Sequence, residues 1–239
     1  MRLSDWFFPP KCVSCGQVIS DPDSSRVFCR VCLSRYYEEI NSPCSFCGKT
    51  YVECCCRPAG FLPDGFVYAL PYDREMRACS SLILFSKSRK NGDVIGFTAE
   101  CCVRKARRLA GIPEDAVLTY VPRLPEKVRK YGIDQAEELA REIGARLSIE
   151  TVRTVRHRSG SAEQKKLGAA DRTGNAEKSY VPVGNLGKLI AGKTVIIVDD
   201  IVTTGSTVNA CTRILRSAGA EKIICLSAAK RDRHTEPLV

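Results

Sequence analysis

Residues 194–207, TVIIVDDIVTTGST, restrict the possible folds of this chain more than any other segment. Four consecutive apolar residues, Val195 to Val198, predict a strand that is buried on both faces, as the strands of parallel sheets are. The carboxylates of Asp199 and Asp200 are expected where this strand emerges from the core. A short loop then opens a helix. This order predicts an α/β fold with a parallel sheet, in which ligands bind at the carboxyl ends of the strands.

The loop after the acid pair predicts a phosphate site. A helix N-terminus preceded by small hydroxyl residues offers free backbone N–H groups and hydroxyl donors, and a glycine lets the backbone approach closely. Because two adjacent acids would repel a bare phosphate, the ligand should also carry hydroxyl groups or a divalent cation. A ribose 5-phosphate meets this requirement, with its diol toward the acids. The loop residues that would hold its phosphate are Thr203, Thr204, Gly205, Ser206 and Thr207.

Two other interpretations of this segment were weighed. The threonines could simply cap the helix of an ordinary strand–turn–helix unit. That interpretation leaves the combination of apolar strand, acid pair and small-hydroxyl loop unexplained. A Walker-type ATP site is not supported, because the sequence contains no GxxxxGK[ST] motif.

The N-terminal part of the chain is rich in cysteine. The chain has 14 cysteines, and nine of them lie in the first 56 residues, where three CxxC pairs occur. Two thiolates from one CxxC turn can reach a single tetrahedral ion, and a second pair completes the site. A secreted disulfide protein would be short and would carry a leader. The clustering therefore predicts structural zinc, and these thiolates are not expected to be catalytic, because all four positions around the ion are filled.

The spacing leaves the pairing of the cysteines open. The strongest set is Cys12, Cys15, Cys29 and Cys32. A second set would combine Cys44 and Cys47 with two of the three adjacent cysteines in the irregular ECCC segment at 53–56, and Cys54 and Cys56 are the expected two. A crossed arrangement, such as 12/15 with 44/47, also satisfies the spacing.

Composition changes near residue 60 and predicts two units. Residues 1–60 have little periodic apolar pattern, so a bound metal or another cross-link is needed to stabilise their fold. Residues 61–239 alternate strand-like and helix-like patterns. Asp134 is expected to cap a helix, with Glu137 three residues later. Strands are expected at 66–71, 117–121, 194–198 and 223–228, helices at 74–85, 92–109 and 208–218, and a long mobile loop at 153–180.

With both parts in view, the chain resembles the ComF family, which is linked to DNA uptake in natural transformation. The segment at 194–207 resembles the phosphoribosyl-pyrophosphate signature of type I phosphoribosyltransferases. The likeness extends over nearly the whole chain. It rests on WFFPPKCVSCG at the start, YALPYDREMR at 68–77, VPRLPEKVRKYGIDQAEELA at 121–140, the 164–175 loop and DDIVTTGSTVNAC at 199–211.

The resemblance implies a type I phosphoribosyltransferase-like domain at 61–239 and a cysteine-rich zinc-binding module at 1–60. It implies that Asp199 and Asp200 are the catalytic acids and that Mg²⁺ accompanies phosphoribosyl pyrophosphate. The expected binding residues are Val198, Asp199, Asp200, the 203–207 loop and Arg123, with Gln164, Arg172 and Asn175 in a hood over the ligand. The chain departs from the family at 131–135, where YGIDQ stands in place of RGFNQ; Arg129 and Lys130 could supply the missing charge.

Two functions remain open from the sequence. The first is support of DNA uptake, with phosphoribosyl pyrophosphate or a related nucleotide in the pocket and with single-stranded DNA and competence-machinery proteins as partners. The second is phosphoribosyl transfer in nucleotide salvage. The net charge of +10 fits a polyanion partner or simply a solvated basic surface, and two zinc ions each held by four thiolates would lower it to about +6.

The remaining sequence features concern location and the histidines. Apolar runs are far shorter than the roughly 18 residues of a membrane span, and the N-terminus lacks the apolar core of a signal peptide. We therefore expect a cytoplasmic protein. His157 and His234 lie in charged stretches and are expected to be solvated surface residues, not bases.

Overall fold

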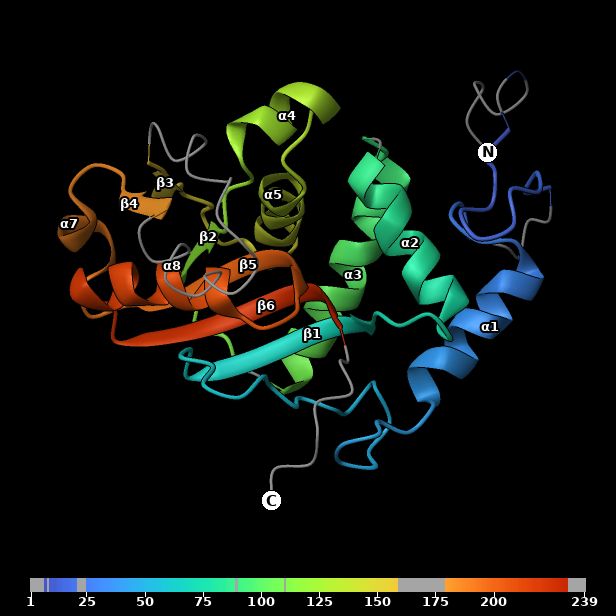
Figure 1. Ribbon diagram of the computed structural model, residues 1–239, viewed down its shortest axis with the longest axis horizontal. Coiled ribbons are helices and arrows are strands. Elements are labelled where there is room, and N and C mark those ends of the chain that lie inside the picture. Colours follow the sequence, from blue (N-terminus) through green and yellow to red (C-terminus); the bar gives the residue numbers. More distant parts are fainter. Residues whose placement is uncertain are drawn as a thin grey trace, which may run out of the picture.

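The computed structural model describes residues 7, 9–20, 25–88, 90–109, 111–158 and 179–231. Its centre is a four-stranded sheet in the order β1-β6-β5-β2, in which all neighbouring strands are parallel. Figure 1 shows this sheet in the middle of the molecule. The strands are β1 (Gly65–Pro71), β2 (Val117–Tyr120), β5 (Thr194–Val202) and β6 (Lys222–Lys230).

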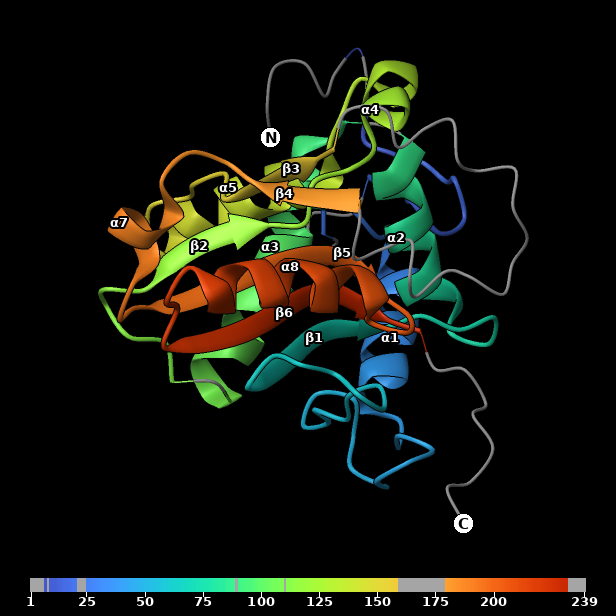
Figure 2. The ribbon, with the colours of Figure 1, turned by 60° about the vertical axis from the view of Figure 1, so that its left-hand side comes forward.

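Helices cover both faces of this sheet. One face carries α3 (Gly92–Leu109) and α5 (Gln135–Leu147), and the other carries α8 (Ser206–Ser217), as Figures 1 and 2 show. The two central strands are almost entirely buried because apolar side chains of β5 and β6 meet helices on both sides. The predicted fold class, a helix-flanked parallel sheet, is confirmed.

The predicted helix cap at Asp134 is confirmed. Its side chain accepts a hydrogen bond from the backbone N–H of Glu137 at 3.4 Å, and the α5 residues Leu139, Ala140 and Ile143 are buried against the sheet. Shorter elements complete the upper part of the chain in Figure 1: α4 (Pro125–Tyr131), β3 (Val155–His157), β4 (Tyr180–Pro182) and α7 (Leu186–Ile190). Strands β3 and β4 pair antiparallel, so the segment 153–180, predicted to be a loop, contains a strand near its start and meets a second strand at its last residue.

Strand β5 is longer than predicted. It continues past Val198 to Val202, because β6 runs alongside and pairs with it as far as Lys230. The acid pair therefore lies within the last part of the strand and not after it. The predicted helix at 74–85 also shifts, since α2 spans Arg77–Ser88.

The cysteine-rich segment contains a helix that its sequence pattern did not predict, α1 (Arg30–Asn41), which packs against α2. Phe28 and Tyr36 from this segment stack on each other and contact Phe97 of α3 edge-on. The two predicted units thus share one hydrophobic core. The boundary at residue 60 remains a prediction.

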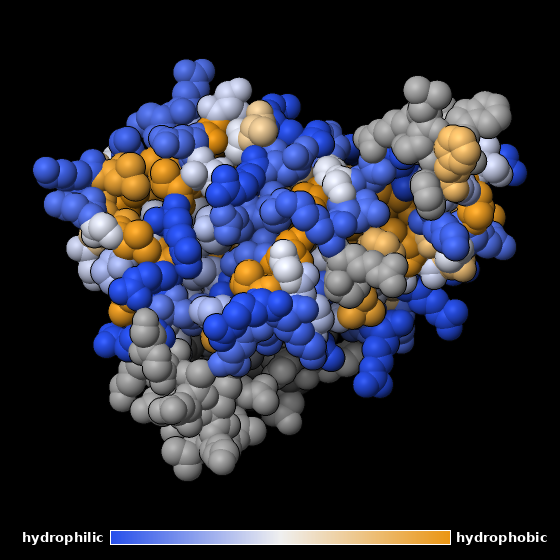
Figure 3. All heavy atoms as spheres, turned by 90° about the horizontal axis from the view of Figure 1, so that it is seen from above, coloured by the Kyte–Doolittle hydropathy of each residue, from blue (hydrophilic) through white to orange (hydrophobic). Residues whose placement is uncertain are grey.

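Within the described ranges, no helix combines the length and the apolar character that crossing a membrane requires. Figure 3 shows one face of the molecule, on which hydrophilic side chains separate several small apolar areas.

Candidate functional site

The turn between β5 and α8 forms the centre of the candidate site. Gly205 is the N-cap of α8 and has a positive φ of 76°, the left-handed conformation that glycine adopts most readily. Gly205 has no side chain to cap the helix, and the Ser206 N–H makes a long hydrogen bond of 3.5 Å to the Thr204 hydroxyl. The first turn of an α-helix has backbone N–H groups without partners inside the helix, so these groups are available to an anion.

Hydroxyl groups surround the same helix end. The Thr204 and Ser206 hydroxyls lie 2.9 Å apart and hydrogen-bond to each other. Thr203, Ser206 and Thr207 are half-buried, whereas Thr204 is exposed. The structure therefore brings the five predicted loop residues together at one helix terminus, and Val198, also predicted, is fully buried below them. The Val198 carbonyl accepts a hydrogen bond from the N–H of Val121 on the neighbouring segment.

The two carboxylates of the acid pair have different surroundings. Asp199 is buried, with 8% of its surface exposed, and one of its oxygens accepts the Asp200 N–H at 2.9 Å. Burial, and next the charge of Asp200, hold the pKa of Asp199 well above its ordinary value. Asp200 is more exposed and forms an ion pair with Lys87, whose Nζ lies 3.6 Å from the carboxylate. The pair thus combines a buried, proton-retaining acid with a more exposed one.

Arg123, the predicted pyrophosphate-loop residue, is held by three hydrogen bonds and by a contact with an aromatic ring. Its backbone N–H donates to the Asp134 carboxylate at 2.7 Å, and its guanidinium donates to the Ile133 carbonyl at 3.2 Å and to the Gln135 side chain. Its guanidinium also lies over the ring of Tyr131, 4.7 Å from the centroid. Asp134, the acid that departs from the family pattern, thus holds both the Arg123 backbone and the start of α5.

Sequence reasoning missed three residues around the site. Lys87 comes from the end of α2, and Gln135 is buried and donates to the Lys87 carbonyl at 2.9 Å, which links Lys87 to Arg123. His157 was expected to be solvated, but it is half-buried, stacks on Tyr180 with 4.4 Å between ring centroids and has Nε2 3.0 Å from the Pro122 carbonyl. These contacts join segments that are far apart in sequence, so no local sequence pattern could predict them.

Three predicted hood residues, Gln164, Arg172 and Asn175, lie outside the described residues, as does His234.

The cysteines near the N-terminus form two clusters of four. In one cluster, and likewise in the other, all Sγ atoms lie within 4.8 Å of one another. The sets are Cys12, Cys15, Cys29 and Cys32, and Cys44, Cys47, Cys54 and Cys56. Consecutive pairs therefore combine, and the crossed arrangement is not the one the structure adopts. Cys55 is exposed and belongs to neither set.

The spacing of the sulfur atoms suits a tetrahedral metal. A metal–sulfur distance of about 2.3 Å places two ligand sulfurs about 3.8 Å apart. The Cys15 and Cys29 sulfurs are 3.7 Å apart, and the Cys47 and Cys54 sulfurs are 3.6 Å apart. Burial raises the pKa of the Cys12 thiol, but backbone hydrogen bonds outweigh this effect and lower the pKa to about 7. The lower pKa favours the thiolate form that a metal requires. Both clusters can therefore bind a metal ion.

Comparison with known proteins agrees with this architecture. Residues 128–238 match the family model of the phosphoribosyl transferase domain. Over 125 residues the chain is 29% identical to Competence protein F of Haemophilus influenzae, an alignment that covers 51% of this chain and 53% of that protein. The chain thus spans about half the length of the curated relative it matches.

Solved structures similar to the chain include a glutamine phosphoribosylpyrophosphate amidotransferase from B. subtilis, with 18% identity, a TM-score of 0.42 and coverage of 63% of this chain and 30% of that one. A hypoxanthine phosphoribosyltransferase from Staphylococcus aureus has 16% identity and a TM-score of 0.35, and the match covers 59% of this chain and 68% of that one. The domain match includes the whole β5–α8 turn on its parallel sheet, so residues 128–238 are similar to a phosphoribosyl transferase domain, and about half of the chain is similar to Competence protein F.

Proposed function

We propose that the β5–α8 turn binds phosphoribosyl pyrophosphate. The observation that carries the proposal is the juxtaposition of an uncapped helix N-terminus with an acid pair at the carboxyl end of the same strand. The amides and hydroxyls of residues 203–207 would hold the 5-phosphate, and the acids would accept hydrogen bonds from the ribose hydroxyls. Arg123, already oriented by Gln135 and Asp134, would face the pyrophosphate.

The acid pair also fits a role near Mg²⁺. Oxygen ligands from one or two carboxylates and from substrate phosphates are the usual surroundings of this ion, and Asp200 is the more accessible carboxylate. When bound, Mg²⁺ neutralises charge that develops on a leaving pyrophosphate. Lys87 balances the charge of Asp200 in the absence of ligand. When the ligand binds, its ammonium group would either stay paired with Asp200 or pair with the pyrophosphate. No protein nucleophile is needed, since positioning the sugar is the main task of the site.

Calorimetric titration with phosphoribosyl pyrophosphate and Mg²⁺ tests this proposal. We expect Asp199→Asn and Asp200→Asn each to weaken binding at least tenfold, because each removes a carboxyl group that would accept from the ribose or bind the ion. Asp115→Asn is the matched control, since Asp115 is exposed at the opposite end of β2. Equal affinity in all four proteins would remove the site assignment.

Zinc is the metal proposed for the two cysteine clusters. Four thiolates in tetrahedral spacing are typical of structural zinc, and no position would remain open for a substrate. Burial, and after it hydrogen bonds with the other three thiols of its set, raise the pKa of Cys32 to about 12. A bound zinc ion would replace the protons that these thiols share.

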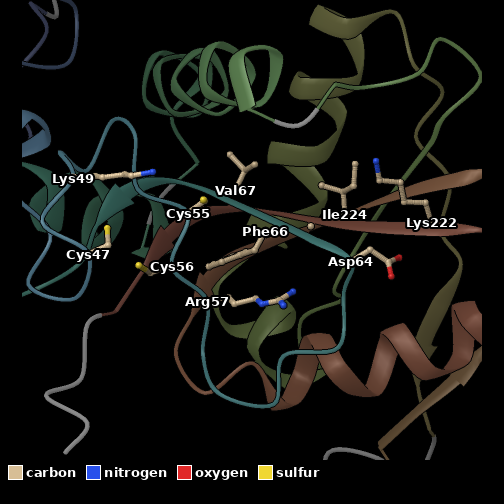
Figure 4. A pocket seen from close by; sticks show the side chains of 11 residues that line it. Cys47, Lys49, Cys55, Cys56, Arg57, Asp64, Phe66, Val67, Lys222 and Ile224 are labelled. Atoms are coloured by element: carbon tan, nitrogen blue, oxygen red, sulfur yellow. The ribbon is translucent and has the colours of Figure 1, made fainter. Parts of the chain in front are cut away.

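For the biological role, we favour support of DNA uptake with single-stranded DNA as a partner in the cytoplasm. The name of the Haemophilus relative supports the competence role. A hollow of about 600 Å³ at the edge strand β1 supports an anionic partner, because Lys49, Arg57 and Lys222 all border it (Figure 4). Asp64, the acid among its lining residues, is bonded to Arg216 by both oxygens.

The salt dependence of DNA binding tests this role. Logarithmic affinity for a labelled single strand should fall linearly as the logarithm of salt concentration rises. Lys222→Ala should reduce that slope by about one, and no binding at low salt would exclude the role. The alternative, phosphoribosyl transfer in salvage, predicts pyrophosphate release when nucleobases are added to the protein with phosphoribosyl pyrophosphate.

A further inference from the structure

Residues 203–207, which we name the phosphate loop, are in contact with the segment that follows the second cysteine cluster in the sequence. This segment, residues 57–64, follows Cys56 and ends where β1 begins; we name it the strap. Figure 4 shows the chain curving from Arg57 past the beginning of α8 to Asp64. The strap thus joins a cluster that can hold a metal to the helix that would hold the phosphate.

Asn209 fastens the strap to the first turn of α8. Its side-chain oxygen accepts the N–H of Leu62 at 2.8 Å, and its side-chain nitrogen donates to the carbonyl of Gly60 at 2.9 Å. The backbone N–H of Asn209 also donates to the Gly205 carbonyl at 2.8 Å. One residue therefore contacts both the strap and the N-cap of the helix.

Phe61, between those two strap residues, packs against Gly205. A Cβ atom added at Gly205 would lie 2.5 Å from the Phe61 ring, far inside van der Waals contact. The ring is buried and lies 4.9 Å, centroid to centroid, from that of Phe66 in β1. The aromatic ring thus occupies the space behind the loop and supports the left-handed turn from the side of the core.

The strap is also fastened to the other end of α8. Arg216 donates to both oxygens of Asp64, at 2.8 and 2.9 Å. Arg216 comes seven positions after Asn209, so the two attachments are about 10 Å apart along the helix. This second attachment is distant from the phosphate loop and has the same two partners, strap and helix.

We infer that Phe61 and Asn209 are positioning residues for the phosphate loop: they hold the strap against Gly205 and so fix the direction of the α8 amides before any ligand binds. The identity of the ligand in this inference rests on the proposed function. Neither residue contacts the acid pair or Arg123 through any hydrogen bond found among the described residues, so their effect should be confined to the phosphate end of the site.

Hydrogen exchange tests the inference without a ligand. In the metal-loaded protein we expect Asn209→Ala to speed amide exchange at residues 209 and 210, the first amides bonded within α8, about tenfold, because two hydrogen bonds that hold the turn are lost. Phe61→Leu, which keeps an apolar side chain, should act in the same direction. Arg216→Ala is the control: it frees the strap only at the far end and should leave these amides unchanged. Unchanged exchange in Asn209→Ala, or an equal rise in Arg216→Ala, would overturn the inference.

Titration separates positioning from a general loss of stability. Asn209→Ala should bind ribose 5-phosphate about tenfold more weakly and bind Mg²⁺-pyrophosphate within twofold of the wild type, because only the phosphate loop is loosened. A variant that weakens both ligands equally would point to a purely structural role and contradict the inference. If the wild type bound neither ligand, the proposed function would fail, and the exchange experiment would still decide the role of the strap.

Discussion

Asp199 illustrates how a binding residue can oppose the stability of its own fold. The carboxyl is buried near Cys211 and Cys225, and burial first, then the charge of Asp199, raises the pKa of both thiols. Lys87 forms its ion pair with the other acid, Asp200. Ionising Asp199 in the free protein is therefore unfavourable, and a ligand that offers hydroxyl donors or a cation would remove that cost.

This cost predicts the pH dependence of stability. Because burial and Asp200 raise the pKa of Asp199 in the folded state, the folded protein keeps a proton that the unfolded chain releases above about pH 4. Stability should therefore fall as pH rises from that value toward the folded-state pKa. Asp199→Asn removes this term, so we expect its unfolding temperature to exceed that of the wild type by about 2–4 °C at pH 8 and by less at pH 5.

Thermal unfolding of ligand-free protein at both pH values measures the effect. Asp200→Asn serves as comparison, because its carboxylate is more exposed and paired with Lys87, and we expect no comparable gain. A lower unfolding temperature for Asp199→Asn at pH 8 would contradict the assignment of a raised pKa. Together with the loss of ligand affinity expected above, the gain would mark Asp199 as retained for function.

Among the elements, α1 and α2 are joined by a cap that comes from a distant part of the chain. Glu39 of α1 is buried, and its two oxygens accept the N–H groups of Ala78 at 2.9 Å and Cys79 at 2.8 Å. These amides belong to the first turn of α2, where free N–H groups favour a negative charge. The cysteine-rich segment thus completes the first turn of a helix that packs against β1 and α3.

Glu39→Ala should lower the free energy of unfolding by about 2–3 kcal/mol, since two hydrogen bonds to a charged group are lost and two buried amides are left without acceptors. Glu39→Gln keeps one oxygen acceptor and should lose about half as much. The control is Glu38→Ala, because Glu38 is exposed and contacts only Ser34 in the same helix; its effect should stay within about 0.5 kcal/mol. Denaturant unfolding measures all three, and equal losses for Glu38→Ala and Glu39→Ala would exclude the cap.

The same element shows where sequence reasoning succeeded and where it did not. Central strands β5 and β6 were predictable because their apolar runs are continuous, and α5 because its cap and its buried face are local patterns. Helix α1 was not, because its sequence, RVCLSRYYEEIN, is mostly polar. Of its three buried residues, Tyr36 and Glu39 gain their hydrogen-bond partners from α3 and α2. The end of β5 was misplaced for a similar reason: its partner β6 decides where pairing stops.

The site divides in the same way. The turn between β5 and α8 and both cysteine sets could be predicted, since each depends on residues that are close in sequence or on a fixed ligand spacing. Lys87, Gln135 and the strap could not, because each acts through contacts between residues more than 40 positions apart. Such contacts exist only once the sheet has brought α2, α5 and α8 to the same edge.

At the scale of the whole molecule, the two cysteine clusters are built into the fold and do not form an appendage. Cys12 and Cys32 belong to the core on the α3 side of the sheet, and Cys44 and Cys54 belong to the core on the α8 side. A further contact ties the second cluster to the domain, since Lys105 of α3 donates to the Tyr51 carbonyl at 2.6 Å. Loss of metal from either cluster should therefore destabilise the parallel sheet and its helices as well.

Metal content decides which of the three adjacent cysteines binds the second ion. Cys54 is buried and its sulfur lies within the cluster, whereas Cys55 is exposed and outside it. We expect about two zinc ions per chain in the wild type and in Cys55→Ser, and about one in Cys54→Ser, measured by mass spectrometry of the metal. Because ligand binding at such a site contributes directly to the free energy of folding, Cys54→Ser should also unfold at a lower temperature than Cys55→Ser. Equal metal content in the two variants would mean that Cys55 can replace Cys54 as a ligand, and it would contradict the assignment of Cys54.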